Sequence, residues 1–214
     1  MTNGKLTKLI DNLKYEDDKP RDYIGASSIG SECYRQIWYE FNCKETFKVP
    51  NRTRRIWNTG KILESYILSL LAECNLSLTP DVAFKDQHFS KFQGHADAVW
   101  NHGLKKVIIE IKTAKDASYK VFVNKGCKLW NPRYYAQIQS YMGMSGINSA
   151  YILVLNKDNS EVFDECVDFD ADFYEGLKQK AKMIYEAKMP PPKINGSPLF
   201  YMCKMCKFKD ICHE

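Results

Sequence analysis

The sequence predicts an α/β fold in which a mixed, mostly antiparallel central sheet is flanked by helices. Two apolar, β-branched runs, residues 94–100 and 107–112, follow each other in the chain, and stretches with helical spacing of apolar residues lie on both sides of them. The length of 214 residues and the hydrophobic fraction of 44% are enough for the core of one domain of ordinary size. We therefore expect one domain over residues 25–214, after a helical and charged extension over residues 1–24.

The composition argues against a membrane protein and indicates a reducing compartment. No run approaches the roughly 18 consecutive apolar residues of a membrane span, and the polar N-terminal stretch lacks a signal-peptide pattern. We therefore expect a cytoplasmic protein whose eight cysteines are thiols or metal ligands, not disulfides. The net charge of +5 permits nucleic-acid binding without requiring it.

Helical patterns fill the first third of the chain. A short helix and a charged connection are predicted over residues 1–20. Ser27 and Ser28 can cap a helix that runs through Tyr39, which would place Cys33 in its first turn.

A longer helix is predicted over residues 51–74, where apolar side chains recur at helical spacing. Gly60 lies in its middle, where glycine costs about 1 kcal/mol relative to alanine, and we interpret it as a point of close approach by another backbone or by a substrate. Glu64 follows one turn later on the same face. It is either a solvated helix carboxylate or a ligand or orienting group for a metal.

The two central runs predict a hairpin with a turn at residues 101–103. Because side chains alternate between the faces of a strand, Glu110 and Lys112 share one face and the isoleucines around them share the other. A carboxylate and an ammonium group inside a core-like strand are costly to bury unless they are paired or bind a metal. Asp97 on the neighbouring strand adds a second carboxylate, so the hairpin is a candidate Mg²⁺ or Mn²⁺ site.

The elements around and after the hairpin alternate between strands and helices. Residues 113–130 are rich in lysine with interleaved aromatic side chains, which suits either a groove that tracks single-stranded nucleic acid or an ordinary mobile surface segment. The other predicted elements are a strand around residues 82–89, a helix over 134–144, strands over 150–155 and 161–168, and a helix capped by Asp170 that ends near Met189.

Three cysteines near the end of the chain indicate a metal site. Cys203, Cys206 and Cys212 lie within ten residues, which is a strong metal signal in a reducing compartment. Four thiolates would hold a [4Fe–4S] cluster, whereas tetrahedral zinc would take Cys33 or His213 as its fourth ligand. Structural zinc more often uses two close cysteine pairs, and this tail has one, so the spacing favours iron–sulfur.

Four short motifs follow one another in a recognisable order. They are Gly60…Glu64, Gly94-x-x-Asp97, Glu110-x-Lys112 and Gln137-x-x-x-Tyr141. In this combination the chain resembles the RecB-like nuclease domains of the PD-(D/E)xK superfamily, which implies a restriction-endonuclease-like core over roughly residues 25–213. With Cys33 upstream of the cysteine tail, it is similar to the iron–sulfur subgroup, whose members include CRISPR-associated RecB-like exonucleases and phage-encoded relatives.

The resemblance implies a role for the hairpin residues. Asp97 and Glu110 would ligate a divalent cation, together with the Ile111 carbonyl. Lys112 would position or polarise the attacking water and stabilise the charged phosphate.

The resemblance also implies roles for residues outside the hairpin. Gln137 and Tyr141 would line the cleft and contact the DNA backbone or the metal waters. Many members carry histidine in the helical motif where this chain has Leu63, and because leucine cannot ligate a metal, that role passes to Glu64. Cys33 becomes the fourth cysteine ligand, so that the cluster joins the N- and C-terminal segments.

The expected function is a Mg²⁺- or Mn²⁺-dependent deoxyribonuclease, an exonuclease that acts on single-stranded DNA or on DNA ends. Phage recombination and CRISPR spacer acquisition would use the same active site, with protein partners of either process. Two other classes remain open on the same fold: a non-catalytic DNA-binding module and a redox-sensing, iron–sulfur DNA-binding protein. RNA is an alternative substrate.

Overall fold

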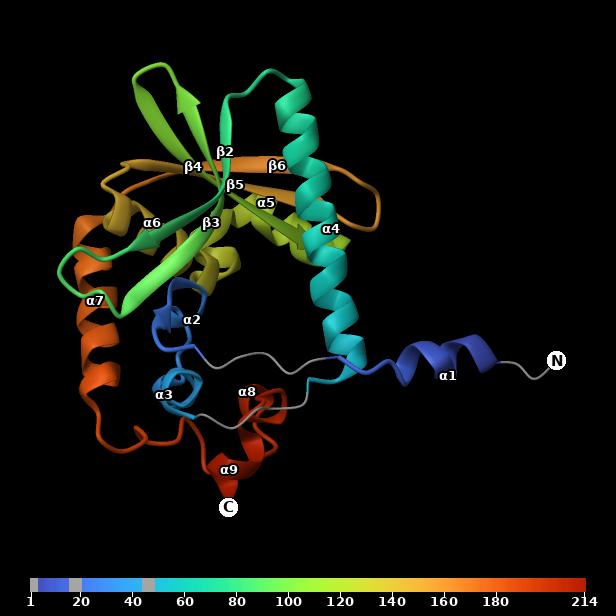
Figure 1. Cartoon of the computed structure of the whole chain (residues 1–214), viewed down its shortest axis with the longest axis vertical. Coiled ribbons are helices and arrows are strands. Elements are labelled where there is room, and N and C mark those ends of the chain that lie inside the picture. The colour runs from blue at the N-terminus through green and yellow to red at the C-terminus, as the bar shows by residue number, and fades with distance from the viewer. Residues whose placement is uncertain (1–3, 16–20, 44–48) are drawn as a thin grey trace.

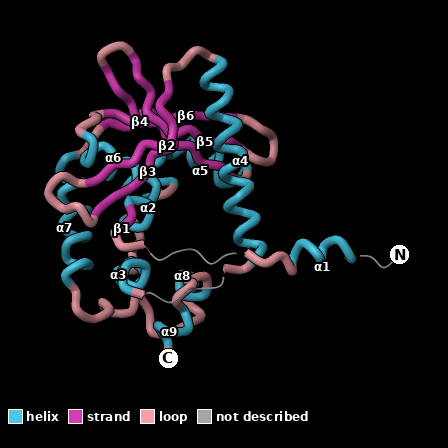
Figure 2. Tube along the Cα trace, in the orientation of Figure 1, coloured by secondary structure: helices cyan, strands magenta, loops and turns pink. Residues whose placement is uncertain are grey.

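The computed structural model describes residues 4–15, 21–43 and 49–214, which form one central sheet with helices on both faces (Figures 1 and 2). The strands of the sheet are β1 Ile24–Gly25, β2 Leu78–Lys85, β3 Phe92–His102, β4 Lys105–Ala114, β5 Ser149–Asn156 and β6 Val162–Asp168. Their order is β1-β3-β4-β5-β6, with β2 also paired to β3. The β1–β3 and β4–β5 pairs are parallel and the others antiparallel, so the prediction of a mixed, mostly antiparallel sheet is confirmed.

The helices are distributed over both ends of the chain. They are α1 Lys5–Asp11, α2 Ala26–Ile29, α3 Tyr34–Asn42, α4 Asn51–Glu73, α5 Asp116–Trp130, α6 Pro132–Ser145, α7 Ala171–Glu186, α8 Tyr201–Lys204 and α9 Lys209–His213. Among the described segments, none of these helices combines the length and the apolar character that a membrane crossing needs.

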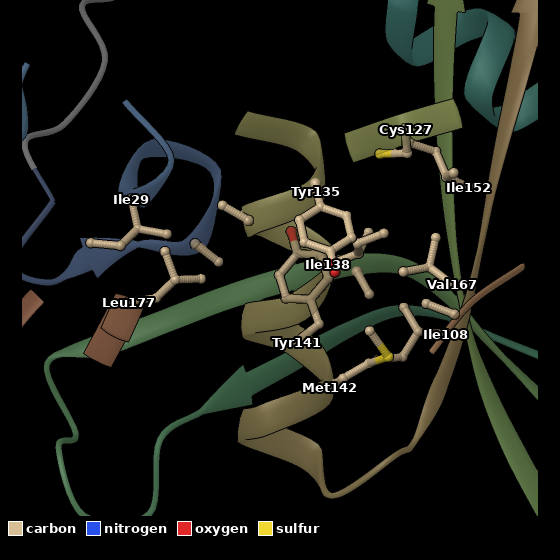
Figure 3. Packing of buried hydrophobic residues seen from close by; sticks show 14 of the residues in the cluster. Ile29, Ile108, Cys127, Tyr135, Ile138, Tyr141, Met142, Ile152, Val167 and Leu177 are labelled. Atoms are coloured by element: carbon tan, nitrogen blue, oxygen red, sulfur yellow. The ribbon is translucent and has the colours of Figure 1, made fainter. Parts of the chain in front are cut away.

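Two apolar clusters hold helices against opposite faces of the sheet. On one face, α4 packs through Ile67 against Ile109 and Ile111 of β4. On the other face, α6 buries Ile138 in the cluster that contains Ile108 of β4, and Figure 3 shows this helix between the sheet and the α2 and α7 side chains. Strand β4 is therefore covered on both faces, which places its polar side chains in a water-poor environment.

Local signals at helix ends explain why α6 and α7 begin where they do. Asn131 caps α6 by accepting the N–H of Arg133, and Pro132 occupies the first position, where its missing N–H costs nothing. Asp170 caps α7 as predicted and accepts the N–H of Phe173 at 3.0 Å. Helix α7 ends at Glu186, three residues before the predicted end.

The predicted continuous helix from Ser27 through Tyr39 is wrong. Helix α2 ends at Ile29, and α3 begins only at Tyr34, with Cys33 at its N-cap position and not in its first turn. Gly30 follows α2 because a Cβ there would lie 2.6 Å from the Cα of Arg133 in α6. Gly30 therefore lies where α2 packs closely on α6, and this contact is not visible in the local sequence.

Two other element predictions need correction. Strand β2 ends at Lys85 because Asp86 starts a turn, its Oδ1 accepting the N–H groups of His88 at 2.9 Å and Phe89 at 2.6 Å. Residues 116–130 form α5, which has a kink at Gly126 and buries Phe122. The hairpin turn is also shorter than predicted, since β3 continues through residue 102.

The terminal segments lie at the end of the molecule away from β4. Helix α1 has no buried residues and projects from the body (Figure 1), tied to α4 by an Arg55–Asp11 ion pair of 2.8 Å. The rest of the predicted N-terminal segment, residues 1–3 and 16–20, is outside the described residues. Helices α8 and α9 pack beside α3, where the ring of Tyr39 stacks on Phe208 at 5.4 Å.

Candidate active site

The candidate site lies where β3 and β4 separate. The ladder between the two strands runs from His102 and Lys105 to the pair Ala98 and Ile109. Asp97 and Glu110 are each the next residue beyond that last pair. The structure therefore brings the two predicted carboxylates together at a fork in the sheet, where the strands no longer bond to each other.

A backbone hydrogen bond fixes the Asp97 carboxylate at this fork. The N–H of Ile111 donates to Asp97 Oδ2 at 2.6 Å. This bond uses one carboxylate oxygen and orients the side chain across the gap between the strands. Burial raises the pKa of Asp97, and the Lys112 ammonium group and this hydrogen bond partly oppose that shift.

Glu110 is almost fully buried, with 1% of its surface exposed. Its Oε1 accepts a hydrogen bond from Gln137 Nε2 at 2.8 Å and forms a short ion pair with Lys112. Its Oε2 is buried and has no hydrogen-bond partner. An unpaired buried carboxylate oxygen is costly, so this atom marks the place where a further group would bind.

Helix α6 supplies the polar wall behind Glu110. Gln137 and Tyr141 are four residues apart on one helix face, and Gln137 Nε2 also lies 2.7 Å from the Tyr141 hydroxyl. The tyrosine reaches this position because Gly94 of β3 has no side chain, since a Cβ there would lie 2.5 Å from Tyr141 Cε1. The glycine three residues before Asp97 thus makes room for the α6 wall, which the sequence did not reveal.

The charges at the site act strongly on one another. Burial raises the pKa of Glu110 to about 8, although the Lys112 ammonium group opposes the shift. The pKa of Lys112 is also raised, because attraction to the Glu110 and Asp97 carboxylates outweighs its burial. Lys112 is therefore a cation throughout the physiological pH range.

Tyr134 is a neighbour of Lys112 that sequence reasoning missed. The Lys112 Nζ lies 4.8 Å from the centroid of the Tyr134 ring, within cation–π distance. Tyr134 stands one turn before Gln137 on α6, and this spacing is the signal that could have identified it.

Helix α4 brings Glu64 to the edge of the site. Burial raises the pKa of Glu64, and the nearby Asp97 carboxylate adds to the shift. Leu63, its neighbour, packs instead into the apolar cluster on β4. Gly60 is not a point of close approach by another part of the described chain, because a Cβ there would meet no atom within 4 Å.

Sequence reasoning also missed an acidic residue near the fork. Asp81 of β2 has a positive φ of 49° and pairs with the His95 ring at 3.2 Å. Its carboxylate contributes to the raised pKa values of both Asp97 and Glu64. The fork is therefore bordered by carboxylates from β2, β3, β4 and α4.

The carboxylate oxygens at the fork are suitable ligands for a hard divalent cation. Within residues 4–15, 21–43 and 49–214, no three His, Cys, Asp or Glu side chains converge closely enough to hold a metal ion. Mg²⁺ is commonly held by one or two carboxylates, with water filling the other positions. Asp97 and Glu110 match that pattern, and the free Oε2 of Glu110 is an oxygen ligand without another role.

A second candidate site is a pocket between α3 and the C-terminal helices. All four predicted cysteine ligands line it: Cys33, Cys203, Cys206 and Cys212. Burial raises the pKa values of Cys203 and Cys206, and the other cysteines of the pocket add to both shifts. The four thiols are therefore neighbours, although Cys33 is about 170 residues away in sequence.

The other cysteines, Cys43, Cys74, Cys127 and Cys166, are not among the residues that line this pocket. Cys74 and Cys166 are exposed, and Cys127 is fully buried in the large apolar cluster. His213 lines the pocket with the four cysteines.

Comparison with solved structures identifies the fold. No protein-family model matches the sequence, and neither does any curated protein. An alkaline exonuclease, LHK-Exo, from Laribacter hongkongensis matches 78% of this chain and 87% of its own, with a TM-score of 0.61 and 14% identity. A phage-related exonuclease from Haemophilus somnus 129PT matches 79% of this chain and 92% of its own, with a TM-score of 0.55 and 14% identity.

The fold of this chain is similar to that of these two exonucleases. A further match, the protein SSO0001, extends over 97% of this chain and 91% of its own, with a TM-score of 0.59 and 22% identity. The resemblance read from the motifs is thus confirmed at the level of the fold.

Proposed function

We propose that the protein is a divalent-metal-dependent deoxyribonuclease, an exonuclease that acts on single strands or ends of DNA. The observation that carries the proposal is the buried Glu110, whose free Oε2 lies beside a paired lysine at the fork with Asp97. The exonuclease fold supports it, and one of the similar structures, LHK-Exo, was solved with dAMP. Such an activity would serve phage recombination or CRISPR spacer acquisition.

The residues of the fork would have different roles in phosphodiester hydrolysis. When bound, a divalent cation stabilises negative charge on phosphate and increases the acidity of water. Asp97 and Glu110 would bind this cation. The Ile111 N–H positions the Asp97 carboxylate, and Gln137 positions that of Glu110. Lys112, whose raised pKa keeps it charged, would stabilise charge on the phosphate and does not serve as the proton acceptor.

We also propose that Cys33, Cys203, Cys206 and Cys212 hold a [4Fe–4S] cluster. The four thiols line one pocket, and the C-terminal segment has a single close cysteine pair, not the two pairs that structural zinc sites more often use. Both features support the cluster over zinc.

The test of the nuclease is cleavage of end-labelled DNA. Purified protein is incubated with single-stranded and double-stranded DNA labelled at either end, in Mg²⁺, Mn²⁺ or a chelator. We expect stepwise shortening that requires metal and is lost in Glu110→Gln. DNA binding without cleavage in either metal would instead indicate a non-catalytic binding module.

A further inference from the structure

The cysteine pocket contains two buried nitrogen atoms that have no hydrogen-bond partner among the described residues. Arg35 and His213 both line the pocket with the four cysteines. Arg35 Nε and His213 Nε2 are buried and lack any hydrogen-bond partner among the described residues. A buried polar nitrogen without a partner loses the hydrogen bonds that it makes with water in the unfolded chain, and the loss is larger when the group is charged. Two such atoms in one pocket therefore indicate a partner that the described residues do not supply.

The positions of these two residues connect them with the cysteines. Arg35 follows Cys33 by two residues at the start of α3, and His213 directly follows Cys212 at the end of α9. The Arg35 guanidinium lies 5.8 Å from the ring centroid of Tyr39, whose ring stacks on Phe208. An aromatic pair thus forms one wall beside the arginine.

The charge of the pocket is what a bound iron–sulfur cluster requires. Four thiolates around such a cluster give it a net negative charge, and burying a charge is unfavourable unless opposite charges or hydrogen bonds compensate. Lys193 and Lys209 also line the pocket, together with Arg35. The described residues that line the pocket therefore include three cations and no carboxylate.

We propose that Arg35 Nε and His213 Nε2 donate hydrogen bonds to the sulfur atoms of the group held by the four cysteines. This inference rests on the cluster proposed above and assigns two positioning residues to it. Hydrogen bonds to sulfur and nearby positive charge stabilise the more negative, reduced state of a cluster, so they raise its reduction potential. Both residues would therefore tune the cluster electronically.

The test measures reduction potentials in the full chain after anaerobic iron and sulfide reconstitution. Arg35→Met and His213→Phe remove one donor each, and Arg35→Lys keeps the charge without the Nε donor. We expect equal iron content, a shift to more negative potential in the first two, and a smaller shift in Arg35→Lys. Arg52→Met, which changes an exposed arginine on α4, is the matched control and should leave the potential unchanged.

A second measurement in the unmutated protein covers the case in which a variant loses iron. Protein labelled with ¹⁵N in arginine or histidine is reduced, and pulsed EPR is used to detect ¹⁵N coupling to the cluster. Coupling from both labels supports the inference. Unchanged potentials in iron-loaded variants, or the absence of both couplings, overturn it.

The metal content separates this inference from the nuclease. One zinc per chain and no iron after reconstitution would overturn both the cluster and the two donors. The DNA cleavage assay on the same preparation would then decide the nuclease on its own.

Discussion

The two candidate sites are built in opposite ways. The fork is made by β3 and β4, which are inner strands of the sheet, and by α6, which covers one face of it. Its side chains are oriented by hydrogen bonds to Gln137 and to the Ile111 N–H. The cysteine pocket is closed by α8 and α9, helices of four and five residues. Helices so short are not stable alone in water, so the pocket depends on tertiary contacts and on what it binds.

This difference leads to separate expectations for the two sites. Removing a ligand from the fork should abolish chemistry and leave the fold, whereas removing one from the pocket should weaken the fold. Each of the following experiments tests one side of that contrast.

The largest effect is expected at the fork. Substitution of Asp97, Glu110 or Lys112 by alanine should lower the cleavage rate by about a thousandfold or more, because the three side chains act on one phosphate as a unit. A double substitution should be little worse than either single one. Cleavage rates with labelled DNA, together with circular dichroism of each variant, provide the measurement.

The matched control for this experiment is Glu73→Ala, an exposed carboxylate at the end of α4. It should leave the rate unchanged. If Glu110→Ala cut DNA in Mn²⁺ at a rate close to that of the unmutated protein, the assignment of the fork as the active site would be wrong.

At the cysteine pocket the expected effect is on stability. Cys33→Ser and Cys206→Ser should each lower the unfolding temperature by about 5–15 °C, because a ligand set that closes a long loop contributes several kcal/mol. Cys74→Ser, on the exposed end of α4, should not change it. Thermal unfolding of anaerobically purified protein gives the comparison.

The outcome distinguishes the metal as well as the role. Brown protein with about four iron atoms per chain would support the cluster. Fully folded Cys33→Ser and Cys206→Ser proteins with unchanged unfolding temperatures would show that the pocket does not join the termini through a metal.

The same contrast explains what could be read from the sequence. The alternation of polar and apolar residues in β4 predicted the shared face of Glu110 and Lys112, because strand periodicity is local. The close contact between Gly30, at the end of α2, and α6 could not be predicted, since it joins segments more than 100 residues apart. The role of Gly94 beside Tyr141 was missed for the same reason.

The cysteine pocket shows a different limit. The tail spacing predicted a metal site from three residues, but the neighbourhood of Cys33 came only from the family resemblance, because spacing cannot reveal a contact across about 170 residues. The buried donors Arg35 and His213 gave no sequence signal of their own, since burial without a partner is a property of tertiary structure.

A smaller effect at the fork is expected from pH. Because burial raises the pKa of Glu110 to about 8, a proton occupies its carboxyl at lower pH and must leave when metal binds. The apparent Mg²⁺ or Mn²⁺ dissociation constant should therefore fall about tenfold per pH unit between pH 6 and 8 and level off above. Calorimetric titration at several pH values measures it.

The raised pKa of Glu110 also makes the stability of the folded protein depend on pH. A carboxyl whose pKa is higher in the folded protein than its usual 4.5 contributes stability at low pH that is lost as pH rises through about 8. Metal-free protein should lose stability over that range relative to Glu110→Gln, and added Mg²⁺ should restore it. A metal dissociation constant that does not depend on pH would show that Glu110 is not a metal ligand.

The smallest expected effect concerns Glu64, which lies at the edge of the fork on α4. It is partly buried and near Asp97, and both of these raise its pKa, but the structure gives it no hydrogen bond to the other site residues. We therefore expect Glu64→Ala to lower activity about tenfold, the size of effect typical of groups that orient a ligand, and to raise the metal concentration for half-maximal activity. Glu73→Ala, on the same helix but exposed, should change neither quantity. Equal effects of the two substitutions would show that Glu64 is a solvated helix carboxylate and that the fork has two carboxylate ligands. A loss of activity as large as that of Glu110→Ala would instead identify Glu64 as a third carboxylate ligand.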